Sequence, residues 1–258
     1  MIDGPAAHLL EIAEIERVAA LGWRGLEEER LGDWLLRAGN GFTGRANSAL
    51  PLGDPDYGLD AAIDAVANWY RVRQLNPLVQ VPLELREDVD EALDRRGWQA
   101  FNRTYVLVGH LDELLERAAP IADLPAATLD TRPTHAWLGG YRYRGSTLPV
   151  GAEDVLSRAV DPVFASVQVG GRVVAVGRGV VDEGWLGVTA VTVDDAHRRR
   201  GLASHVMRAT AVWAAARGAE RVYLQVAAEN TAALAMYDRL GLERHHEYRY
   251  RRLDLSVT

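Results

Sequence analysis

The stretch VTAVTVDDAHRRRGLASHVM, residues 188–207, carries the strongest structural signal in the chain. It predicts a strand over residues 188–193, a short loop with arginines at 198–200, and a helix that starts after Gly201. The N-terminus of a helix has unpaired backbone N–H groups, and its dipole favours a negative charge. Three adjacent cations would be disfavoured there without an anion. We therefore expect a multiply charged anion, most simply a diphosphate, over residues 201–203.

The loop also contains a recognisable short motif. Arg198, Gly201 and Ala203 match the pattern Gln/Arg-x-x-Gly-x-Gly/Ala. This pattern resembles the acyl-CoA signature of the GNAT acetyltransferases. It is too short to identify a family without further support.

A second stretch, LQVAAENTAALAMYDRLGL at residues 224–242, supplies that support. It is similar to the family's strand, Asn, helix, Tyr and terminal Gly, carried here by Asn230, Tyr237 and Gly241. Asn230 is also a good helix N-cap in its own right. The two stretches at the family spacing imply an α/β (α+β) GNAT fold, with mixed twisted sheets flanked by helices.

The resemblance implies an N-acetyltransferase that uses acetyl-CoA as co-substrate. In such enzymes an amine attacks the thioester directly, backbone N–H groups at the end of the strand stabilise the oxyanion, and Tyr237 is the general acid for the departing sulfur. The residues expected to contact the cofactor are Val191, Val193, Arg198, Arg199, Arg200, Gly201, Leu202, Ala203, Ser204 and Asn230.

Other parts of the catalytic site are less defined. No carboxylate lies within residues 185–193, although acidic pairs flank this strand at 182–183 and 194–195, so a general base is not evident and a water relay could serve instead. Trp137, Tyr141, Arg142 and Tyr143 either line an acceptor pocket or form an ordinary surface cluster. No metal is expected, because the adjacent histidines at 245–246 would point to opposite faces of a strand.

The composition excludes several classes of protein. The net charge of -7 argues against a nucleic-acid partner, whose binding proteins normally present a basic face. The chain has no cysteine, which excludes a cysteine thioester. Its first residues lack the basic and apolar regions of a signal peptide, and no apolar run reaches the ~20 residues of a membrane span. We expect a cytoplasmic protein without a membrane partner, acting on a small-molecule or peptide amine.

The first half of the chain repeats the second at an offset of 144 residues. The offset aligns Trp69 with Trp213 and Gly97 with Gly241. It places Asp54, Tyr57 and Leu93 where the second half has Arg198, Gly201 and Tyr237, and the RANS run at 45–48 where the catalytic strand would be. We therefore expect two tandem GNAT-like domains, a degenerate one at 1–118 and a catalytic one at 119–258.

Three functions remain open at this point. The chain could be an acetyl-CoA-dependent N-acetyltransferase, which the retention of Tyr237 favours. It could be a non-catalytic CoA sensor or scaffold, or a small-metabolite acetyltransferase resembling mycothiol synthase. The sequence does not identify the acceptor or the oligomeric state.

Overall fold

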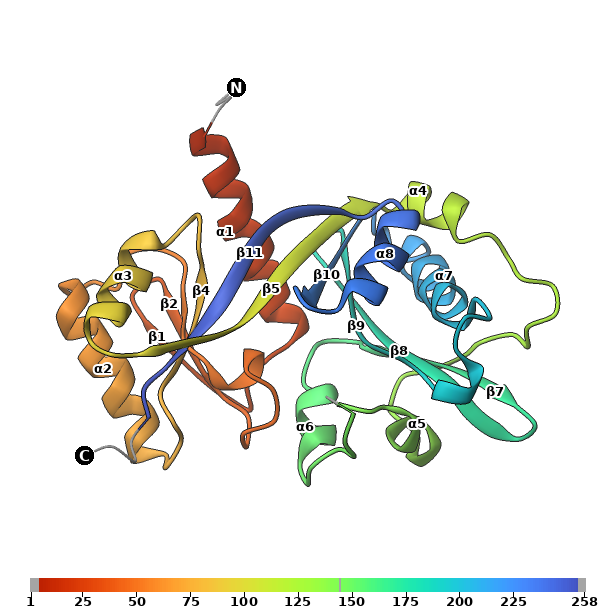
Figure 1. Ribbon diagram of the computed structural model, residues 1–258, viewed down its shortest axis with the longest axis horizontal. Helices are drawn as coiled ribbons and strands as arrows, with labels where there is room; N and C mark the ends of the chain where they lie inside the picture. Colours follow the sequence, from red (N-terminus) through yellow and green to blue (C-terminus); the bar gives the residue numbers. More distant parts are fainter. Residues whose placement is uncertain (1–4, 144, 255–258) are drawn as a thin grey trace. The chain divides into compact units, whose positions relative to one another are not determined.

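The computed structural model of the protein describes residues 5–143 and 145–254 (Figure 1). The chain divides into two compact units: unit 1 comprises Met1–Val106 and His245–Thr258, and unit 2 comprises Leu107–Arg244. This division differs from the expected cut after residue 118. The end of β5 and helix α4 belong to unit 2, whereas most of the last strand, β11, belongs to unit 1, where it pairs antiparallel with β4.

Unit 1 contains a small antiparallel sheet in the order β1-β2-β3, and a second set of strands in the order β4-β11-β5. Its core lies between these strands and helices α2 and α3, and includes Trp34, Tyr70 and Leu93. The elements with residues in unit 1 are α1 (Pro5–Gly22), β1 (Glu27–Leu31), β2 (Trp34–Ala38), the 3-10 helix η1 (Arg45–Asn47), β3 (Leu50–Pro51), α2 (Leu59–Val72), β4 (Leu78–Pro82), α3 (Glu87–Arg95), β5 (Gln99–His110) and β11 (Glu243–Arg252).

Unit 2 contains strands in the order β10-β9-β8-β7-β6. Strands β9 and β10 pair in parallel. The pairings of β6 with β7, β7 with β8 and β8 with β9 are antiparallel. Its elements are α4 (Leu111–Arg117), β6 (Thr128–Asp130), α5 (His135–Gly140), α6 (Ala152–Leu156), β7 (Val163–Val169), β8 (Arg172–Asp182), β9 (Trp185–Val193), the 3-10 helix η2 (Asp195–His197), α7 (Leu202–Ala215), β10 (Arg221–Ala227) and α8 (Thr231–Arg239).

Strand β8 is covered by helices on both faces. A Cβ added to Gly177 would meet Val206 of α7, whereas the side chain of the preceding residue, Val176, lies against Gly140 of α5. Successive side chains of a strand point to opposite faces, so α7 and α5 cover opposite sides of the sheet. The β7–β8 hairpin turns at Gly170 and Gly171, which both have positive φ, as a two-residue hairpin requires.

The expected repeat holds for part of each unit. Helices α3 and α8 begin and end at residues that differ by 144, and β5 and β11 begin at that same offset. The offset fails at the counterpart of β9, because residues 45–47 form the 3-10 helix η1 and the strand is reduced to Leu50–Pro51. The RANS run at 45–48, which the repeat places where the catalytic strand would be, therefore lies outside any strand.

Asn47 explains this irregular segment. Its Oδ1 accepts hydrogen bonds from the backbone N–H groups of Gly39 (2.8 Å) and Gly41 (2.9 Å). Its Nδ2 donates to the carbonyls of Phe42 (2.9 Å) and Thr43 (2.8 Å). One buried side chain thus satisfies four backbone groups of a loop, which accounts for Asn47 without any role in catalysis.

No helix among the described residues is long and apolar enough to cross a membrane.

Candidate active site

Strands β9 and β10 of unit 2 separate towards their carboxyl ends. They pair from Trp185 with Arg221 to Val188 with Leu224, and the ladder stops there although β9 continues to Val193 and β10 to Ala227. Residues 189–193 therefore have backbone groups on the β10 side that this ladder does not use. These groups include the N–H donors that the sequence assigns to Val191 and Val193.

A β-bulge marks the start of this separation. On the other side of β9 the register with β8 shifts between Val176 and Arg178, so that Gly177 lies opposite two residues of β9. Ala190, within the bulge, has a φ of 58°, which is unusual for a residue with a side chain. A bulge bends its strand and increases the local twist, so it directs the end of β9 away from β10.

The arginine loop exposes a run of unused backbone donors. Arg199 and Gly201 both adopt left-handed conformations, and α7 starts at Leu202 with no side-chain cap. The first helical bond is from the N–H of His205 to the carbonyl of Gly201 (2.9 Å). The backbone N–H groups of residues 199–204 donate no hydrogen bond within the described part of the chain. Such a concave run of donors at a helix N-terminus is a suitable anion site.

The three arginines differ in their contacts. Arg198 pairs with Asp195 at 2.6 Å, so part of its charge is already balanced. Arg199 and Arg200 are exposed and form no ion pair with any described residue. The two arginines after Arg198 are therefore the cations available to an anion at the start of α7.

The topology of the sheet places α8, which Asn230 caps and which contains Tyr237, next to the arginine loop in the strand order. Because β9 and β10 are parallel neighbours, the arginine loop that follows β9 and the Asn230 that follows β10 leave the same edge of the sheet. Asn230 caps α8, and its Oδ1 accepts from the N–H of Ala233 at 3.2 Å. The helix ends at Arg239, and Gly241, two residues further on, has a φ of 82°, the left-handed conformation common after a helix C-terminus.

Tyr237 has an environment that fits a proton donor. The residue is 8% exposed, and its hydroxyl group makes no hydrogen bond with any residue that the structure describes. Burial raises the pKa of Tyr237 to about 12. The hydroxyl oxygen is not among the fully buried atoms that lack a partner, so it keeps enough access to donate to a polar group of a ligand.

The acidic residues near β9 do not provide a free base. Asp194 Oδ1 accepts from the N–H of Ala196 (3.0 Å) and lies 3.1 Å from His197 Nδ1, and the hydrogen bond from His197 is the main cause of its lowered pKa. Asp195 is paired with Arg198. Asp182 lies where β9 begins, so the length of the strand separates it from the arginine loop.

The four residues suggested for an acceptor pocket have different locations. Trp137 is fully buried, and its indole N–H donates to the carbonyls of Ala165 (3.0 Å) and Gly177 (3.2 Å). Tyr141 is also buried and packs against it. Both are core residues rather than pocket residues.

Arg142 does line a cavity, of about 360 Å³, between α5, α6 and the loop that joins them. Its other lining residues include His135, Leu148 and Glu153. Tyr143 is outside this set and forms a bridge with Ser146. Arg142 is thus the one member of the predicted group that lies in an open cavity.

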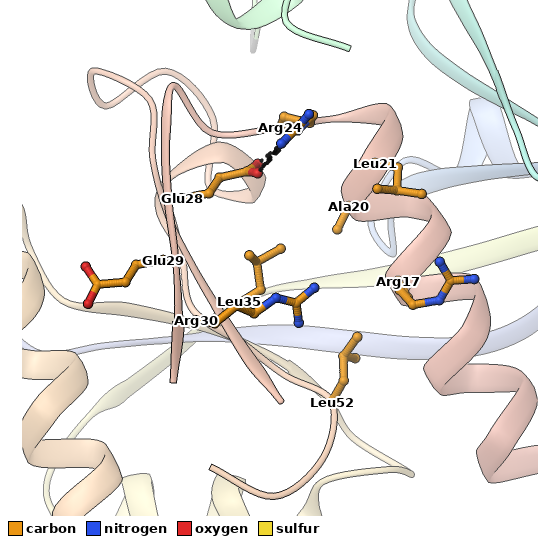
Figure 2. A pocket seen from close by; sticks show the side chains of 9 residues that line it. All are labelled: Arg17, Ala20, Leu21, Arg24, Glu28, Glu29, Arg30, Leu35 and Leu52. Carbon is orange, nitrogen blue, oxygen red and sulfur yellow. Dashed lines mark hydrogen bonds and ion pairs between the residues drawn. The ribbon is translucent and has the colours of Figure 1, made fainter. Parts of the chain in front are cut away.

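Unit 1 has a cavity of its own, of about 330 Å³, between α1 and the small sheet. Figure 2 shows Arg24 bonded to Glu28 at this cavity, and Glu29 turned to the face of β1 opposite the helix. The cavity contains no residue predicted for acetyl transfer.

Sequence reasoning missed the features that shape the site. The bulge at Ala190 has no signature in the sequence VTAVTV. Gly177 was a possible signal, because a glycine inside a buried strand often marks a bulge or a close approach of another element. Ile121 was also missed: its Cδ1 lies 2.3 Å from where a Cβ of residue 201 would be, so any side chain there would displace Ile121 and would also be strained by the φ of 78°.

Comparison with known structures identifies the class of protein. A GCN5-related N-acetyltransferase from Kribbella flavida superposes with a TM-score of 0.66 at 16% identity, over 93% of this chain and 94% of that one. A tandem GNAT protein from the clavulanic acid biosynthesis pathway gives 0.51 at 14% identity, over 75% of this chain and 69% of that one. The fold is therefore that of the GNAT N-acetyltransferase superfamily, which confirms the α/β fold predicted from the sequence.

The family within this superfamily is also established. Residues 10–251 match the family described as Probable histone acetyltransferase Rv0428c C-terminal, and the chain belongs to it. The Probable histone acetyltransferase Rv0428c of Mycobacterium tuberculosis is 31% identical over 93% of this chain and 73% of its own length. The Uncharacterized N-acetyltransferase YobR of Bacillus subtilis is 26% identical over 93% of this chain and 98% of its own.

Proposed function

We propose that unit 2 is an acetyl-CoA-dependent N-acetyltransferase that transfers the acetyl group directly to an amine. The observation that carries this proposal is the run of unused N–H groups at 199–204 beside the unpaired Arg199 and Arg200. Backbone donors and fixed cations together match the diphosphate of CoA. The separated ends of β9 and β10 leave strand edges to which an extended pantetheine arm could bond.

Tyr237 is the proposed general acid. As the amine nitrogen forms its bond to the acetyl carbon, the C–S bond breaks and the phenolic hydroxyl gives its proton to the departing sulfur. A pKa of about 12 keeps Tyr237 protonated at all physiological pH values. Burial raises the pKa of Tyr237, and it also raises the pKa of the CoA thiol formed beside it. The transfer of the proton from Tyr237 to the sulfur therefore stays feasible. The proton lost by the amine leaves through water, since Asp194 and Asp195 at the end of β9 are already paired.

We propose a basic amine as the acceptor. The chain has a net charge of -7, which attracts cationic substrates. One relative carries the name Probable histone acetyltransferase, which makes a lysine side chain a reasonable candidate. The cavity at Arg142 would instead suit a small acceptor with a carboxylate.

The test is thiol release from acetyl-CoA by the full chain with a panel of amines: lysine-rich histone-tail peptides, polyamines, and amino acids with a free carboxylate. Mass spectrometry of each acceptor identifies the N-acetyl product. We expect amine-dependent thiol release with at least one class. The pairing of Asp194 with His197 and of Asp195 with Arg198 favours a second function, a non-catalytic CoA sensor, because it engages the carboxylates at the end of β9. Tight acetyl-CoA binding with no transfer to any amine would support the sensor.

A further inference from the structure

Three metal-binding side chains lie together in unit 1, where the first turns of α1 pass β11. His8, Glu11 and His245 each offer a ligand atom, and these atoms lie within 4.8 Å of one another. The rings of His8 and His245 have centroids 4.9 Å apart, and His245 Nε2 lies 3.5 Å from Glu11 Oε2. His8 and Glu11 are three residues apart on a helix and therefore share a face.

His245 is held in position by buried neighbours. Its Nδ1 lies 2.9 Å from Nδ1 of His246, and Nε2 of His246 lies 3.0 Å from Glu16 Oε1. The side chains of His246 and Glu16 are almost fully buried. Such outer hydrogen bonds are characteristic of metal-binding histidines, because they set the orientation and tautomer of the ring.

The buried hydrogen-bonded chain continues beyond Glu16. Glu16 Oε2 accepts from Gln80 Nε2 (2.8 Å), and Gln80 Oε1 accepts from the buried Arg37 (3.0 Å). These contacts hold the carboxylate of Glu16, and through it the ring of His246, in one position.

The contact with His246 also orients the ring of His245. Because Nδ1 of His245 faces His246, its Nε2 faces the carboxylate of Glu11, 3.5 Å away. An imidazole nitrogen and a carboxylate oxygen on the same side of a small cluster are both suitable ligands for a divalent cation.

We propose that His8, Glu11 and His245 bind a divalent transition metal of the zinc type. Two histidines and one glutamate, with a water as fourth ligand, form a known zinc set. A tetrahedral site places its ligand atoms about 3.4 Å apart, so the cluster must contract on binding. His8 and Glu11 can move because they lie at the surface of α1. His8 Nε2 also contacts Glu84 (2.9 Å), a carboxylate that can orient this ring in turn.

The sequence prediction of no metal considered only the adjacent pair at 245–246. That pair does not chelate, since His246 turns inward to Glu16. The partner of His245 is His8, at the other end of the chain, and only the fold brings the two together.

The test is calorimetry with ZnCl₂ on the full chain, stripped with EDTA and then dialysed. We expect one site of micromolar or tighter affinity, and a higher melting temperature when Zn²⁺ is added. His8→Gln and His245→Gln should each weaken the affinity at least tenfold. His110→Gln, an exposed histidine of unit 2, is the matched control and should leave the affinity unchanged. A crystal soaked in ZnCl₂ should show an anomalous peak between the three side chains.

His8 lies on the surface of α1, so His8→Gln is expected to fold even if His245→Gln does not, which circular dichroism without metal will show. His246→Gln tests the orienting residue: it should weaken Zn²⁺ binding while His8 and Glu11 stay in place. Equal Zn²⁺ affinity in the wild type and His8→Gln, or an anomalous peak elsewhere, would overturn the proposal.

Discussion

Tyr237 combines a nearly buried ring with a hydroxyl group that has no partner among the described residues. If the hydroxyl acts only when the sulfur departs, Tyr237→Phe should lower kcat tenfold or more and leave the Kd of acetyl-CoA nearly unchanged, since general acids contribute about 10²–10⁴-fold. The measurement is steady-state thiol release together with calorimetry. An unchanged kcat would make Tyr237 a packing residue.

The pH dependence provides an independent check on Tyr237. With its pKa at about 12, the tyrosine stays protonated throughout the range in which the protein can be assayed. Any alkaline loss of activity below pH 10 in the wild type should therefore persist at the same pH in Tyr237→Phe, because it belongs to another group.

Arg199 and Arg200 are the cations left free by the ion pair of Arg198 with Asp195. Changing both to Ala should weaken acetyl-CoA binding at least tenfold, since a hydrogen bond to a charged group is worth about 1.5–3 kcal/mol. The loss should be smaller for a CoA fragment that lacks the phosphates. Arg158→Ala, an exposed arginine of unit 2, is the control. Equal affinities in both variants would show that the loop is only solvated.

Helix α7 lies against β8 at a position where only glycine fits. A Cβ on Gly177 would lie 2.5 Å from Cγ1 of Val206, which is fully buried. Gly177→Ala should therefore lower the free energy of unfolding by about 1–3 kcal/mol, and should weaken acetyl-CoA binding because α7 carries the anion site. Gly139→Ala, where no atom lies within 4 Å of the added Cβ, is the control in urea unfolding. A similar result for both variants would contradict this packing.

Helix α3 is tied to β11 in unit 1 by Asp90. Burial acts to raise the pKa of this carboxyl, but hydrogen bonds from Arg251 and Arg249 outweigh it and lower the pKa to about 2. The folded-state pKa is below the unfolded value of about 3.9. The stabilisation is therefore complete above pH ~4 and is lost as the pH falls towards 2.

Asp90→Asn should accordingly lower the free energy of unfolding at pH 7 by about 2 kcal/mol. The deficit relative to the wild type should shrink as the pH drops from 4 to 2. Glu91→Gln, a more exposed residue of the same helix, is the matched control. Urea titrations at several pH values measure this difference, and a deficit that is constant from pH 7 to 2 would exclude the proposed linkage.

Local signals in the sequence predicted elements well where the residues themselves determine the conformation. The three-residue spacing from Asn230 to Ala233 gave a capped helix, and Gly201 and Gly241 were read as helix boundaries. Strand β1, with the sequence EEERL, was missed because neither face is apolar enough to show a period of two. Its conformation comes from pairing with β2, which is a tertiary effect.

The parts of the site that depend on tertiary structure could not be predicted. The bulge at Ala190 results from the register of two strands, and neither strand records it in its own sequence. Trp137 was expected either in an acceptor pocket or in a surface cluster, yet its hydrogen bonds to two strand carbonyls make it a core residue. Contacts between distant residues decided both cases.

The two units share a repeated sequence, but only one should bind acetyl-CoA. The counterpart of α7 is α2, which starts after the loop GDPDYG at residues 53–58. Asp54 accepts from the N–H of Asp56 (2.9 Å), and Asp60 lies in the first turn of the helix. Three carboxylates therefore surround the N-terminus that a diphosphate would need, and at close range like charges repel.

The other groups of the site are also missing from unit 1. Leu93, which replaces Tyr237, is fully buried and has no proton to donate. The strand equivalent to β9 is shortened to Leu50–Pro51, so little backbone is left for a pantetheine arm. We expect calorimetry to give one acetyl-CoA per chain, and Arg199→Ala with Arg200→Ala to weaken that single site without revealing another. A stoichiometry of two, or a second site that survives the double substitution, would mean that unit 1 binds the cofactor despite its acidic loop.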